Sequence, residues 1–395
     1  MKILKKIPKI IKQIIDMFIT HIKVFFDKDK KKYKDAWLFC ERGIDAKDNA
    51  YWMFKYVKEN HPEIKAYYII DSQNKKDLDK VSVLGDTIEF NSYEQKKAFI
   101  MAKYYVCTHY GYITKWNYTL YKKIFGRKKK YIFLQHGITK EDISNQINKL
   151  IIDLDIFITA TQDEYKSIIE NKAYGFNKEV KLTGLARFDN LKNYKTKNQI
   201  LFMPTWRSYI IPIDSGLKKE KIFLKSTYYK KINGLLNNKK LIDFLEENDL
   251  DMIFYPHHET QRFIHKFKNK SKNIKIAKEN EYDIQELLKE NKLLITDYSS
   301  VYFDFAYMKK PVIYYQFDQE EYYKNHYSKG YFNYETDGFG PVIKKEEEVV
   351  NELIKSFKNK FKMTEKYTEI VDKTFKYTDA FNCKRIYEEI IKLGD

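Results

Sequence analysis

Apolar and polar positions along the chain follow two rhythms, one typical of buried strands and the other of amphipathic helices. Short apolar runs that end in polar residues predict strands, and apolar residues spaced three or four positions apart predict helices. From Asp35 onward the two kinds of segment alternate, which predicts parallel pairing in a doubly wound α/β sheet. The elements predicted for the first half are strands at 36–40, 65–70, 104–108, 130–134 and 156–159, and helices at 49–59, at 92–102 and from 161.

The second half repeats this alternation after a break. Residues 191–198, LKNYKTKN, are polar and rich in lysine with no apolar period, and we interpret them as an interdomain linker. We therefore expect two Rossmann-like domains, 35–190 and 199–364, that face a cleft, and C-terminal helices at 365–395 that pack back on the first domain. The elements predicted after the linker are a strand within QILFMPTWR, a helix at 241–247, a strand within DMIFYPHHE, a helix at IQELLKE, and a strand, helix and strand within residues 293–318.

Residues 1–34 form a separate segment with helical periodicity. Eleven lysines and three aspartates give this segment +8 of the chain's net charge of +18. Lysines interrupt it throughout and no small-residue cleavage site is present, so we expect neither a signal peptide nor a spanning helix. Apolar residues fall on one face (Ile3, Ile7, Ile10, Ile11, Ile14, Ile15, Phe18, Ile22, Phe25 and Phe26), and Lys5, Lys9, Lys12, Asp16 and Lys23 fall largely on the other.

This periodicity and charge predict an amphipathic arm that lies on an anionic membrane surface. The protein would then be peripheral, on the cytoplasmic face of the cell membrane. The alternative is a helix that packs on the protein's own core or in an oligomer.

Composition limits what the two domains can do. A chain of 395 residues is too long for one ordinary core, which supports two domains. The excess of 73 Lys and Arg over 55 Asp and Glu indicates an anionic partner such as phosphate, nucleic acid or an acidic membrane. Cys40, Cys107 and Cys383 lie far apart without metal-ligand spacing, so we expect no disulfide framework, no zinc site and a reducing compartment.

The stretch 293–318, LLITDYSSVYFDFAYMKKPVIYYQFD, contains the most informative candidate site. A buried apolar run ends in a cluster of small polar residues, and a mostly apolar helix follows directly. Ligands bind at the carboxyl ends of parallel strands, and the free amide groups of a first helical turn attract anions. The cluster therefore predicts a phosphate site, although a simple helix cap by Asp297 or Ser299 explains the local pattern equally well. The cluster consists of Thr296, Asp297, Ser299 and Ser300.

Three other predicted strands also end in polar or charged residues. In an open parallel sheet such ends line one crevice, so we expect all four ends to converge. His136 can accept a proton from an attacking hydroxyl, and Gly137 lets a substrate approach the backbone closely. The alternative is that His136 has only a structural role after its strand. The three ends are QHG at 135–137, PTWR at 204–207 and YPHHE at 255–259.

The other two ends offer an arginine and two histidines. Arg207 can hold a phosphate through two hydrogen bonds, although an arginine just after a strand is usually part of a surface ion pair. We expect either His257 or His258 to point into the cleft while the other packs beside it.

Several standard signatures are missing from the sequence. It has no GxGxxG after a strand, no GxxxxGK[ST], no HExxH and no GxSxG. These absences argue against dinucleotide oxidoreductases, P-loop NTPases, zincins and hydrolases with a nucleophile elbow. Asp153 and Asp155 have the spacing of a metal-binding pair in nucleotide-sugar transferases, but they precede a strand instead of following one.

Residues 293–318 closely resemble the signature of the CDP-glycerol glycerophosphotransferase family, the bacterial teichoic-acid primases and polymerases. QHGITKE resembles the His-Gly motif of that family, FMPTWR its Pro-Thr-x-Arg segment and FYPHHE its second histidine motif, in the same order. The similarity covers roughly residues 36–342. Two departures stand out: Pro-His-His replaces the usual His-Pro, which leaves His257 and His258 both open, and Lys329 stands where arginine is common.

The resemblance implies a GT-B fold in which the second domain holds a CDP-alditol and the first presents an acceptor. An acceptor hydroxyl would attack the β-phosphorus and CMP would leave. By motif, His136 would be the general base, and His257 would assist the departing CMP phosphate. The residues that the resemblance assigns to substrate binding are Gly137, Thr205, Arg207, His258, Thr296, Asp297, Ser299, Ser300 and Asp304.

The implied donor is CDP-glycerol, with CDP-ribitol as the alternative, and the implied acceptor is a lipid-linked or other glycan in teichoic-acid-like or capsular polymer synthesis. No metal ligands are expected, although a diphosphate can recruit Mg²⁺ without a dedicated carboxylate cage. The other candidates are a GT-B glycosyltransferase that uses a nucleotide sugar and a basic nucleic-acid-binding protein. The largest basic concentration is an amphipathic arm instead of an aromatic-lined groove, so we expect no nucleic-acid partner.

Overall fold

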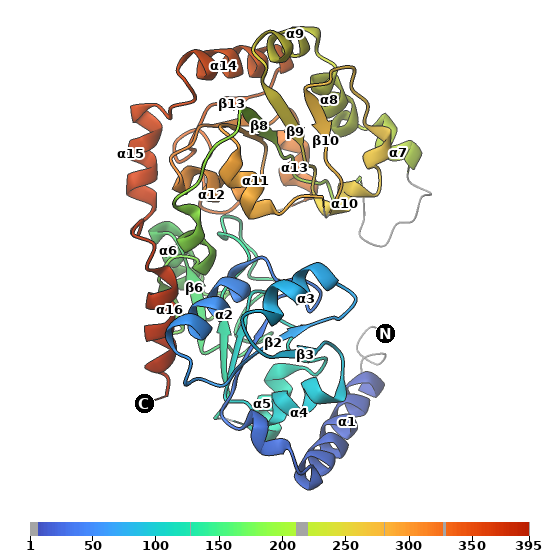
Figure 1. Ribbon diagram of the computed structural model, residues 1–395, viewed down its shortest axis with the longest axis vertical. Helices are drawn as coiled ribbons and strands as arrows, with labels where there is room; N and C mark the ends of the chain where they lie inside the picture. The colour runs from blue at the N-terminus through green and yellow to red at the C-terminus, as the bar shows by residue number, and fades with distance from the viewer. Residues whose placement is uncertain (1–6, 127, 211–219, 280, 327–328, 395) are drawn as a thin grey trace. The chain divides into compact units, whose positions relative to one another are not determined.

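The computed structural model describes residues 7–126, 128–210, 220–279, 281–326 and 329–394 (Figure 1). The chain divides into two compact units. Unit 1 comprises Met1–Ile138, Ile143–Asp189 and Asp379–Asp395, and unit 2 comprises Thr139–Asp142 and Asn190–Thr378. Each unit is built on a parallel sheet with helices, so the predicted α/β class is confirmed.

Unit 1 contains a seven-stranded sheet in the order β3-β2-β1-β4-β5-β6-β7, and every neighbouring pair is parallel. Strands β1, β2, β4 and β6 are buried along their whole length, as expected when helices cover both faces of a parallel sheet. The strands are β1 (Trp37–Cys40), β2 (Ala66–Ile70), β3 (Thr87–Glu89), β4 (Tyr104–Cys107), β5 (Lys130–Phe133), β6 (Ile156–Thr159) and β7 (Val180–Leu182). The helices are α1 (Ile7–Phe26), α2 (Asn49–Asn60), α3 (Lys75–Ser82), α4 (Tyr93–Met101), α5 (Tyr118–Phe125), α6 (Gln162–Glu170) and α16 (Asn382–Ile391), with short 3₁₀ turns at Lys30–Tyr33 and Ala186–Leu191.

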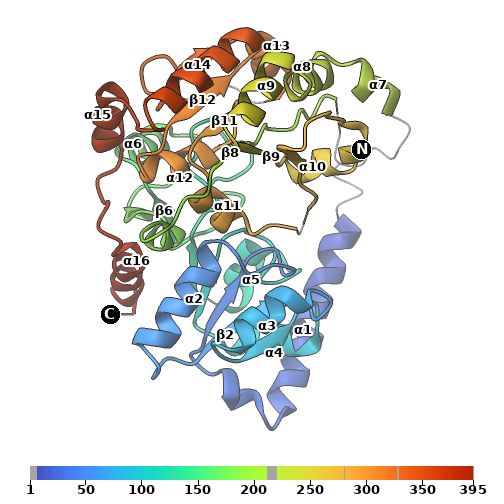
Figure 2. The same ribbon diagram turned by 45° about the horizontal axis from the view of Figure 1, so that its top comes forward.

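Unit 2 contains a six-stranded parallel sheet in the order β10-β9-β8-β11-β12-β13. Helices α8, α9 and α14 pack against one another beside it (Figure 2). The strands are β8 (Gln199–Phe202), β9 (Asp251–Phe254), β10 (Ile274–Ile276), β11 (Leu294–Thr296), β12 (Val312–Tyr315) and β13 (Val342–Ile343). The helices are α7 (Glu220–Lys225), α8 (Thr227–Leu236), α9 (Lys239–Glu247), α10 (His258–Gln261), α11 (Ile284–Glu290), α12 (Val301–Tyr307), α13 (Gln319–Asn325), α14 (Glu346–Lys358) and α15 (Glu365–Thr374), with a 3₁₀ turn at Ile264–Lys266.

The strand order explains why three of the four polar strand ends belong together. Strands β9, β8 and β11 are consecutive neighbours in the unit 2 sheet. Because all three run parallel, the segments that follow them emerge at the same edge of that sheet. The YPHHE, PTWR and TDYSS segments are therefore adjacent, whereas the QHG segment follows β5 of the other sheet.

In each unit, a lysine side chain caps the C-terminal end of one helix in the same way. The Lys129 ammonium donates to the carbonyl oxygens of residues 99, 100 and 102 at the end of α4, at 2.6–3.2 Å. In unit 2 the Lys310 ammonium donates to residues 288, 289 and 291 at the end of α11, at 2.6–2.9 Å. A cation stabilises a helix C-terminus by satisfying its last carbonyl groups and opposing its dipole. Lys129 directly precedes β5, and Lys310 lies two residues before β12.

Helix α1 packs on unit 1 through a narrow face that contains Met17, Thr20 and Val24, all buried. Asp16 anchors this face, because its carboxylate accepts the indole N–H of Trp116 at 2.7 Å and pairs with the Lys96 ammonium at 2.8 Å. Asp16, which the periodicity placed opposite the apolar face, thus ties its side of the helix to unit 1.

The opposite face of α1 is apolar and exposed. The helix thus packs on its own domain and still presents a wide apolar surface, which we call the outer face. Residues 1–6 of the predicted arm, with Ile3 and Lys5, lie outside the described residues. The members of the outer face are Ile11, Ile15, Phe18, Ile19, Ile22, Phe25 and Phe26, which are 47–76% exposed.

The C-terminal tail differs from its prediction in one respect. Helix α15, which the sequence placed on the first domain, belongs to unit 2, and only α16 belongs to unit 1. The backbone N–H groups of Asn382 and Cys383 at the start of α16 donate to the carboxylate of Asp189 at 2.9 and 2.8 Å. Gly184 has φ +85°, and a Cβ there would meet the Asn382 side chain at 2.1 Å, so only glycine allows this close approach.

Candidate functional site

His136 follows β5 on a backbone turn that is held in place. Gln135, directly before it, has φ +58°, a conformation that is uncommon for a residue with a side chain. The Gln135 amide compensates for this strain by donating to the Ile158 carbonyl at 2.6 Å and to the Glu164 carboxylate at 3.0 Å. Strained residues persist where their surroundings hold them, and they gather at functional sites.

The buried side chain of Asn49 links this turn to α2. Its Nδ2 donates to the Gln135 carbonyl at 2.7 Å, and its Oδ1 accepts the backbone N–H of Arg187 at 3.0 Å. The Arg187 guanidinium then donates to the carbonyl of His136 and to the carboxylate of Asp48, both at 3.0 Å. The backbone of His136 is therefore fixed on both sides, which leaves the orientation of its imidazole as the main freedom.

The His136 imidazole stacks on that of His109, with ring centroids 4.6 Å apart and planes 14° apart. Desolvation of the His136 ring, and then the charges of Arg187 and Arg42, lower its pKa to about 4, although the residue as a whole is exposed to solvent. His136 is therefore neutral near pH 7 and able to accept a proton. Burial and then His136 lower the pKa of His109 to about 2, so the partner ring is neutral as well.

His109 follows β4, the sheet neighbour of β5, and the sequence motifs did not single it out. The available signal was its position directly after a predicted strand, within CTHYGY.

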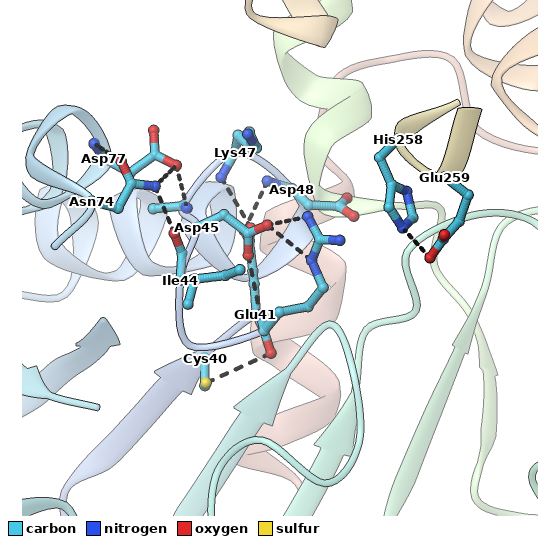
Figure 3. Close-up of polar contacts among 12 residues, drawn as sticks. Cys40, Glu41, Ile44, Asp45, Lys47, Asp48, Asn74, Asp77, His258 and Glu259 are labelled. Carbon is cyan, nitrogen blue, oxygen red and sulfur yellow. Dashed lines mark hydrogen bonds and ion pairs between the residues drawn. The ribbon is translucent and has the colours of Figure 1, made fainter. Parts of the chain in front are cut away.

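A loop of acidic residues follows β1 beside these strand ends (Figure 3). The buried Glu41 carboxylate accepts the backbone N–H groups of Lys47, Asp48 and Tyr51 at 2.7–3.2 Å, so it shapes the loop. Burial, and then the charges of Asp48 and Asp45, raise the pKa of Glu41 to about 8. Glu41 is thus a structural carboxylate rather than a metal ligand. Within the described ranges, no three His, Cys, Asp or Glu side chains are grouped to hold a metal ion.

In unit 2 the structure gives Arg207 a different role from the predicted one. Its side chain is fully buried, and its guanidinium pairs with Asp318 at 2.7 Å and with Asp297 at 2.9 Å. A third bond runs to the Thr205 carbonyl at 2.7 Å, and the Tyr298 ring lies 5.0 Å away. A guanidinium occupied in this way cannot hold a diphosphate. Substrate binding by Arg207 stays a prediction that these contacts argue against, and the ion pair expected at the surface is instead an internal one.

Three further predicted ligands are internal to unit 2. Asp297 is 1% exposed, and its Oδ1 accepts the backbone N–H of Thr205 at 2.8 Å, so it orders the segment after β8. The Thr296 hydroxyl donates to the Met203 carbonyl at 2.7 Å. Asp304 is 1% exposed inside α12, and the Gln285 amide donates to it. These three groups are buried and bond the protein's own backbone or side chains, which argues against direct contact with a substrate, and their predicted roles stay predictions.

Ser299 and Ser300 are the members of the cluster that remain available. Both are half-buried, and neither hydroxyl has a hydrogen-bond partner among the residues that the structure describes. Ser300 occupies the position before α12 without a side-chain cap, and Asp297 bonds elsewhere, so the helix-cap alternative is not what the structure contains. Thr205 is nearly buried, and its Oγ1 likewise has no partner among the described residues.

His257 and His258 differ clearly in their surroundings. His257 stands at the start of α10, where its Nδ1 accepts the backbone N–H of Glu259 at 3.2 Å. Its ring stacks on the indole of Trp206, with centroids 5.7 Å apart. His258 is about half exposed and pairs with Glu259 at 3.4 Å. Nδ1 of His257 is therefore engaged by the backbone at the start of α10.

The structure thus brings His257, Ser299 and Ser300 to one edge of the unit 2 sheet and places His136 at a strand end of unit 1. Gly137 is buried directly after His136. That His136 and the unit 2 residues meet at one site, and that Gly137, Thr205 and His258 bind substrate, stay predictions.

Residues 20–392 match the family described as CDP-Glycerol:Poly(glycerophosphate) glycerophosphotransferase. Over 399 residues the chain is 35% identical to the minor teichoic acid biosynthesis protein GgaB of Bacillus subtilis (strain 168), covering 99% of this chain and 43% of that protein. It is 24% identical over 426 residues to a teichoic acid poly(glycerol phosphate) polymerase of the same strain, covering 98% of this chain and 53% of that protein. The chain therefore spans about half the length of these curated relatives.

Among solved structures, the chain is similar to the wall teichoic acid polymerase TagF, with a TM-score of 0.68 and 17% identity over 99% of this chain and 98% of that one. At this identity the likeness concerns the fold, and it confirms the predicted GT-B class.

Proposed function

The chain belongs to the CDP-glycerol:poly(glycerophosphate) glycerophosphotransferase family. We propose that it transfers an alditol phosphate from a CDP-alditol to a hydroxyl of a glycan acceptor, with glycerol phosphate as the leading candidate. The observation that carries this proposal is the family match, which extends over residues 20–392 and so includes all four polar strand ends. The acceptor would be a lipid-linked or other glycan in teichoic-acid-like polymer synthesis.

In the proposed reaction the acceptor oxygen attacks the β-phosphorus of the donor. The bond between that phosphorus and the bridging oxygen of CMP breaks, and a phosphodiester forms. His136 takes the proton of the attacking hydroxyl, for which its neutral imidazole is suited. His257 assists the departing CMP phosphate, and the hydroxyls of Ser299 and Ser300 donate to the phosphate oxygens of the donor. Phosphoryl transfer needs little more from a protein than positioning, a base and well-placed donors.

CMP release tests the proposal directly. Purified protein is incubated with CDP-glycerol, CDP-ribitol or UDP-sugars together with a lipid-linked glycan acceptor, and free nucleotides are separated and quantified. We expect CMP from CDP-glycerol, and less or none from CDP-ribitol. Release of UDP with no CMP from either CDP-alditol would replace the proposal with the glycosyltransferase alternative.

We also propose that α1 holds the protein on an anionic membrane surface, which would place it on the cytoplasmic face of the cell membrane. The support comes from the outer face of the helix, an apolar strip that the domain leaves exposed, and from Lys9, Lys12 and Lys23 beside it. Apolar burial at the headgroup boundary and attraction of lysines to anionic lipids act together in such helices. Among the described residues, no helix is both long and apolar enough to cross a bilayer.

Replacing Ile15 and Ile22 with glutamine is expected to weaken binding to vesicles of anionic lipids by roughly tenfold or more, because two side chains then no longer enter the apolar layer. Both residues are more than half exposed, at 53% and 59%, so the fold is retained. Flotation of the full-length protein with such vesicles measures the effect. Val83→Gln is the matched control, since Val83 is 84% exposed and stands at the end of another helix, α3. Unchanged flotation of the double variant would contradict the proposal.

A further inference from the structure

Arg42 lies in the loop after β1, at the same edge of the unit 1 sheet as His109 and His136. Strands β1, β4 and β5 are consecutive neighbours in that sheet, and their last residues pair in register. Arg42 follows the last residue of β1 by two positions, as His109 follows that of β4, and His136 follows that of β5 by three. Because parallel strands end at one edge, the three side chains start from adjacent places on it.

The loop that contains Arg42 holds its side chain in place. The Nε of Arg42 donates to Oδ2 of Asp45 at 2.9 Å, Nη2 donates to the same oxygen, and the backbone N–H donates to Oδ1 at 3.3 Å. The next residue, Gly43, has φ +79°, and a Cβ there would clash with the ring of Phe90, so only glycine allows this turn. The guanidinium is therefore positioned before any ligand arrives.

The outer edge of this guanidinium is open. Both side-chain bonds to Asp45 use the Nε side, and Nη1 makes no hydrogen bond with any residue that the structure describes. The Arg42 side chain is 36% exposed, whereas that of Arg207 is fully buried between two carboxylates. A half-exposed ion pair contributes little to stability, so the main effect of Asp45 is to orient the guanidinium.

The open edge of Arg42 lies beside neutral rings. The imidazoles of His109 and His136 stack with centroids 4.6 Å apart, and the Tyr112 ring meets that of His109 edge-on at 6.2 Å. Tyr112 is 39% exposed, and His136 is exposed as well. Desolvation is the main cause that lowers the pKa of each histidine, and the charge of Arg42 contributes to both, which places the guanidinium near the two rings.

The carboxylates of the same loop do not oppose an anion here (Figure 3). Burial, and then the charges of Asp48 and Asp45, raise the pKa of Glu41 to about 8, so Glu41 is mostly protonated near pH 7. Asp45 is paired with Arg42, and Asp48 is paired with Arg187 at 3.0 Å. These three carboxylates therefore carry little uncompensated negative charge.

We propose that Arg42 is an acceptor-binding residue, whose open edge binds a phosphate group of the acceptor while His136 takes the proton of the attacking hydroxyl. This inference rests on the proposed function and deepens it, because it specifies an acceptor that already carries an alditol phosphate. The outer N–H groups of a guanidinium match two oxygens of one phosphate.

The spacing of the two groups suits such an acceptor. The ends of β1 and β5 lie two strand spacings apart, about 10 Å, which one alditol unit between a hydroxyl and a phosphate can span. Each transfer leaves a phosphate of this kind one alditol unit away from a new terminal hydroxyl. The product of one transfer is then a substrate for the next, so Arg42 favours repeated addition.

Acceptor selectivity separates this role from a structural one. Two lipid-linked glycan acceptors are compared with CDP-glycerol as the donor, one that ends in a single glycerol phosphate unit and one that lacks it. For Arg42→Gln we expect the KM of the phosphate-bearing acceptor to rise roughly tenfold or more, and the KM of the other acceptor and the Kd of CDP-glycerol to change by about twofold or less. Arg42→Lys, which keeps the charge without the paired geometry, should lie between, and it carries the comparison if glutamine destabilises the loop.

Lys55→Gln is the matched control for the loss of one positive charge. Lys55 belongs to the same unit, its side chain is 35% exposed, and it also pairs with a carboxylate, that of Glu59. This variant should match the wild type with both acceptors. If Arg42 only shapes its loop, Arg42→Gln would lose turnover equally with both acceptors, which would overturn the inference. A raised Kd for CDP-glycerol would assign the arginine to the donor and would overturn it as well.

Failure of the proposed function has a different signature. A wild type that releases no CMP from CDP-glycerol with either acceptor refutes the proposed function, and bis(glycerol) phosphate then serves as the probe of the anion site. Its binding to the full-length protein is followed by ligand-observed nuclear magnetic resonance. Binding that disappears in Arg42→Gln and persists in Lys55→Gln would support the phosphate site. Equal binding by the wild type and Arg42→Gln, or no binding by the wild type, would overturn it.

Discussion

Replacing His136 with alanine is expected to slow CMP release by roughly 10²- to 10⁴-fold, the usual contribution of a general base. The imidazole is neutral, stands directly after a strand and is held by a strained turn whose backbone Asn49 and Arg187 fix. Removing the side chain leaves this turn intact, because those bonds involve the main chain of residues 135 and 136. The loss should therefore appear in kcat, with little change in the affinity for CDP-glycerol.

Steady-state rates of CMP release and circular dichroism spectra of the same samples measure this effect. His265→Ala is a matched control, since it removes an exposed imidazole that has no proposed role. A His136→Ala enzyme with full turnover and a native spectrum would refute the base assignment, and the stacked His109 would become the next candidate.

The pH dependence of the wild type follows from the same environment. A base must be unprotonated to act, and the pKa of His136 is lowered to about 4, below the ordinary value of about 6.5 for histidine. As the pH falls, activity should therefore persist through pH 6 and decline only as the pH approaches that lowered pKa. A kcat/KM profile that already halves near pH 6.5 would show that the ring is not shielded in this way.

Much of the fold was accessible from the sequence because buried parallel strands have a strong local signature. The run from Ile156 to Thr159 is a strand with the predicted bounds, and the apolar run at Leu293–Ile295 leads into β11. The short strands β3, β7 and β13 were not predicted. They have only two or three residues each, which is too short for the apolar run by which a buried strand is predicted.

The candidate site was less accessible, because its chemistry depends on partners distant in the chain. By its sequence position Arg207 is a plausible phosphate ligand, but its guanidinium pairs with Asp318, which lies 111 residues later in the chain. Asp304 has an acidic side chain in a promising motif, but its helical position turns it inward between Phe303 and Phe305.

The internal ion pairs of Arg207 lead to the largest expected change in stability. Replacing it with methionine leaves the carboxylates of Asp297 and Asp318 buried without their cation. Breaking a buried ion pair by removing one partner costs about 3–5 kcal/mol. We therefore expect a markedly lower urea midpoint for Arg207→Met, followed by circular dichroism. Arg262→Met, which removes a partly exposed arginine paired with Glu259, should cost about 1 kcal/mol or less.

A triple variant separates a structural arginine from a substrate-binding one. Adding Asp297→Asn and Asp318→Asn to Arg207→Met removes the uncompensated charges, so the triple variant should be more stable than the single one. Such a recovery is not expected if the arginine acts on substrate, because neutral amides do not replace a phosphate ligand. If Arg207→Met instead unfolds at the wild-type urea concentration yet no longer binds CDP-glycerol, the guanidinium would have to leave its carboxylates during binding. The assignment of Arg207 as a purely internal cation would then be wrong.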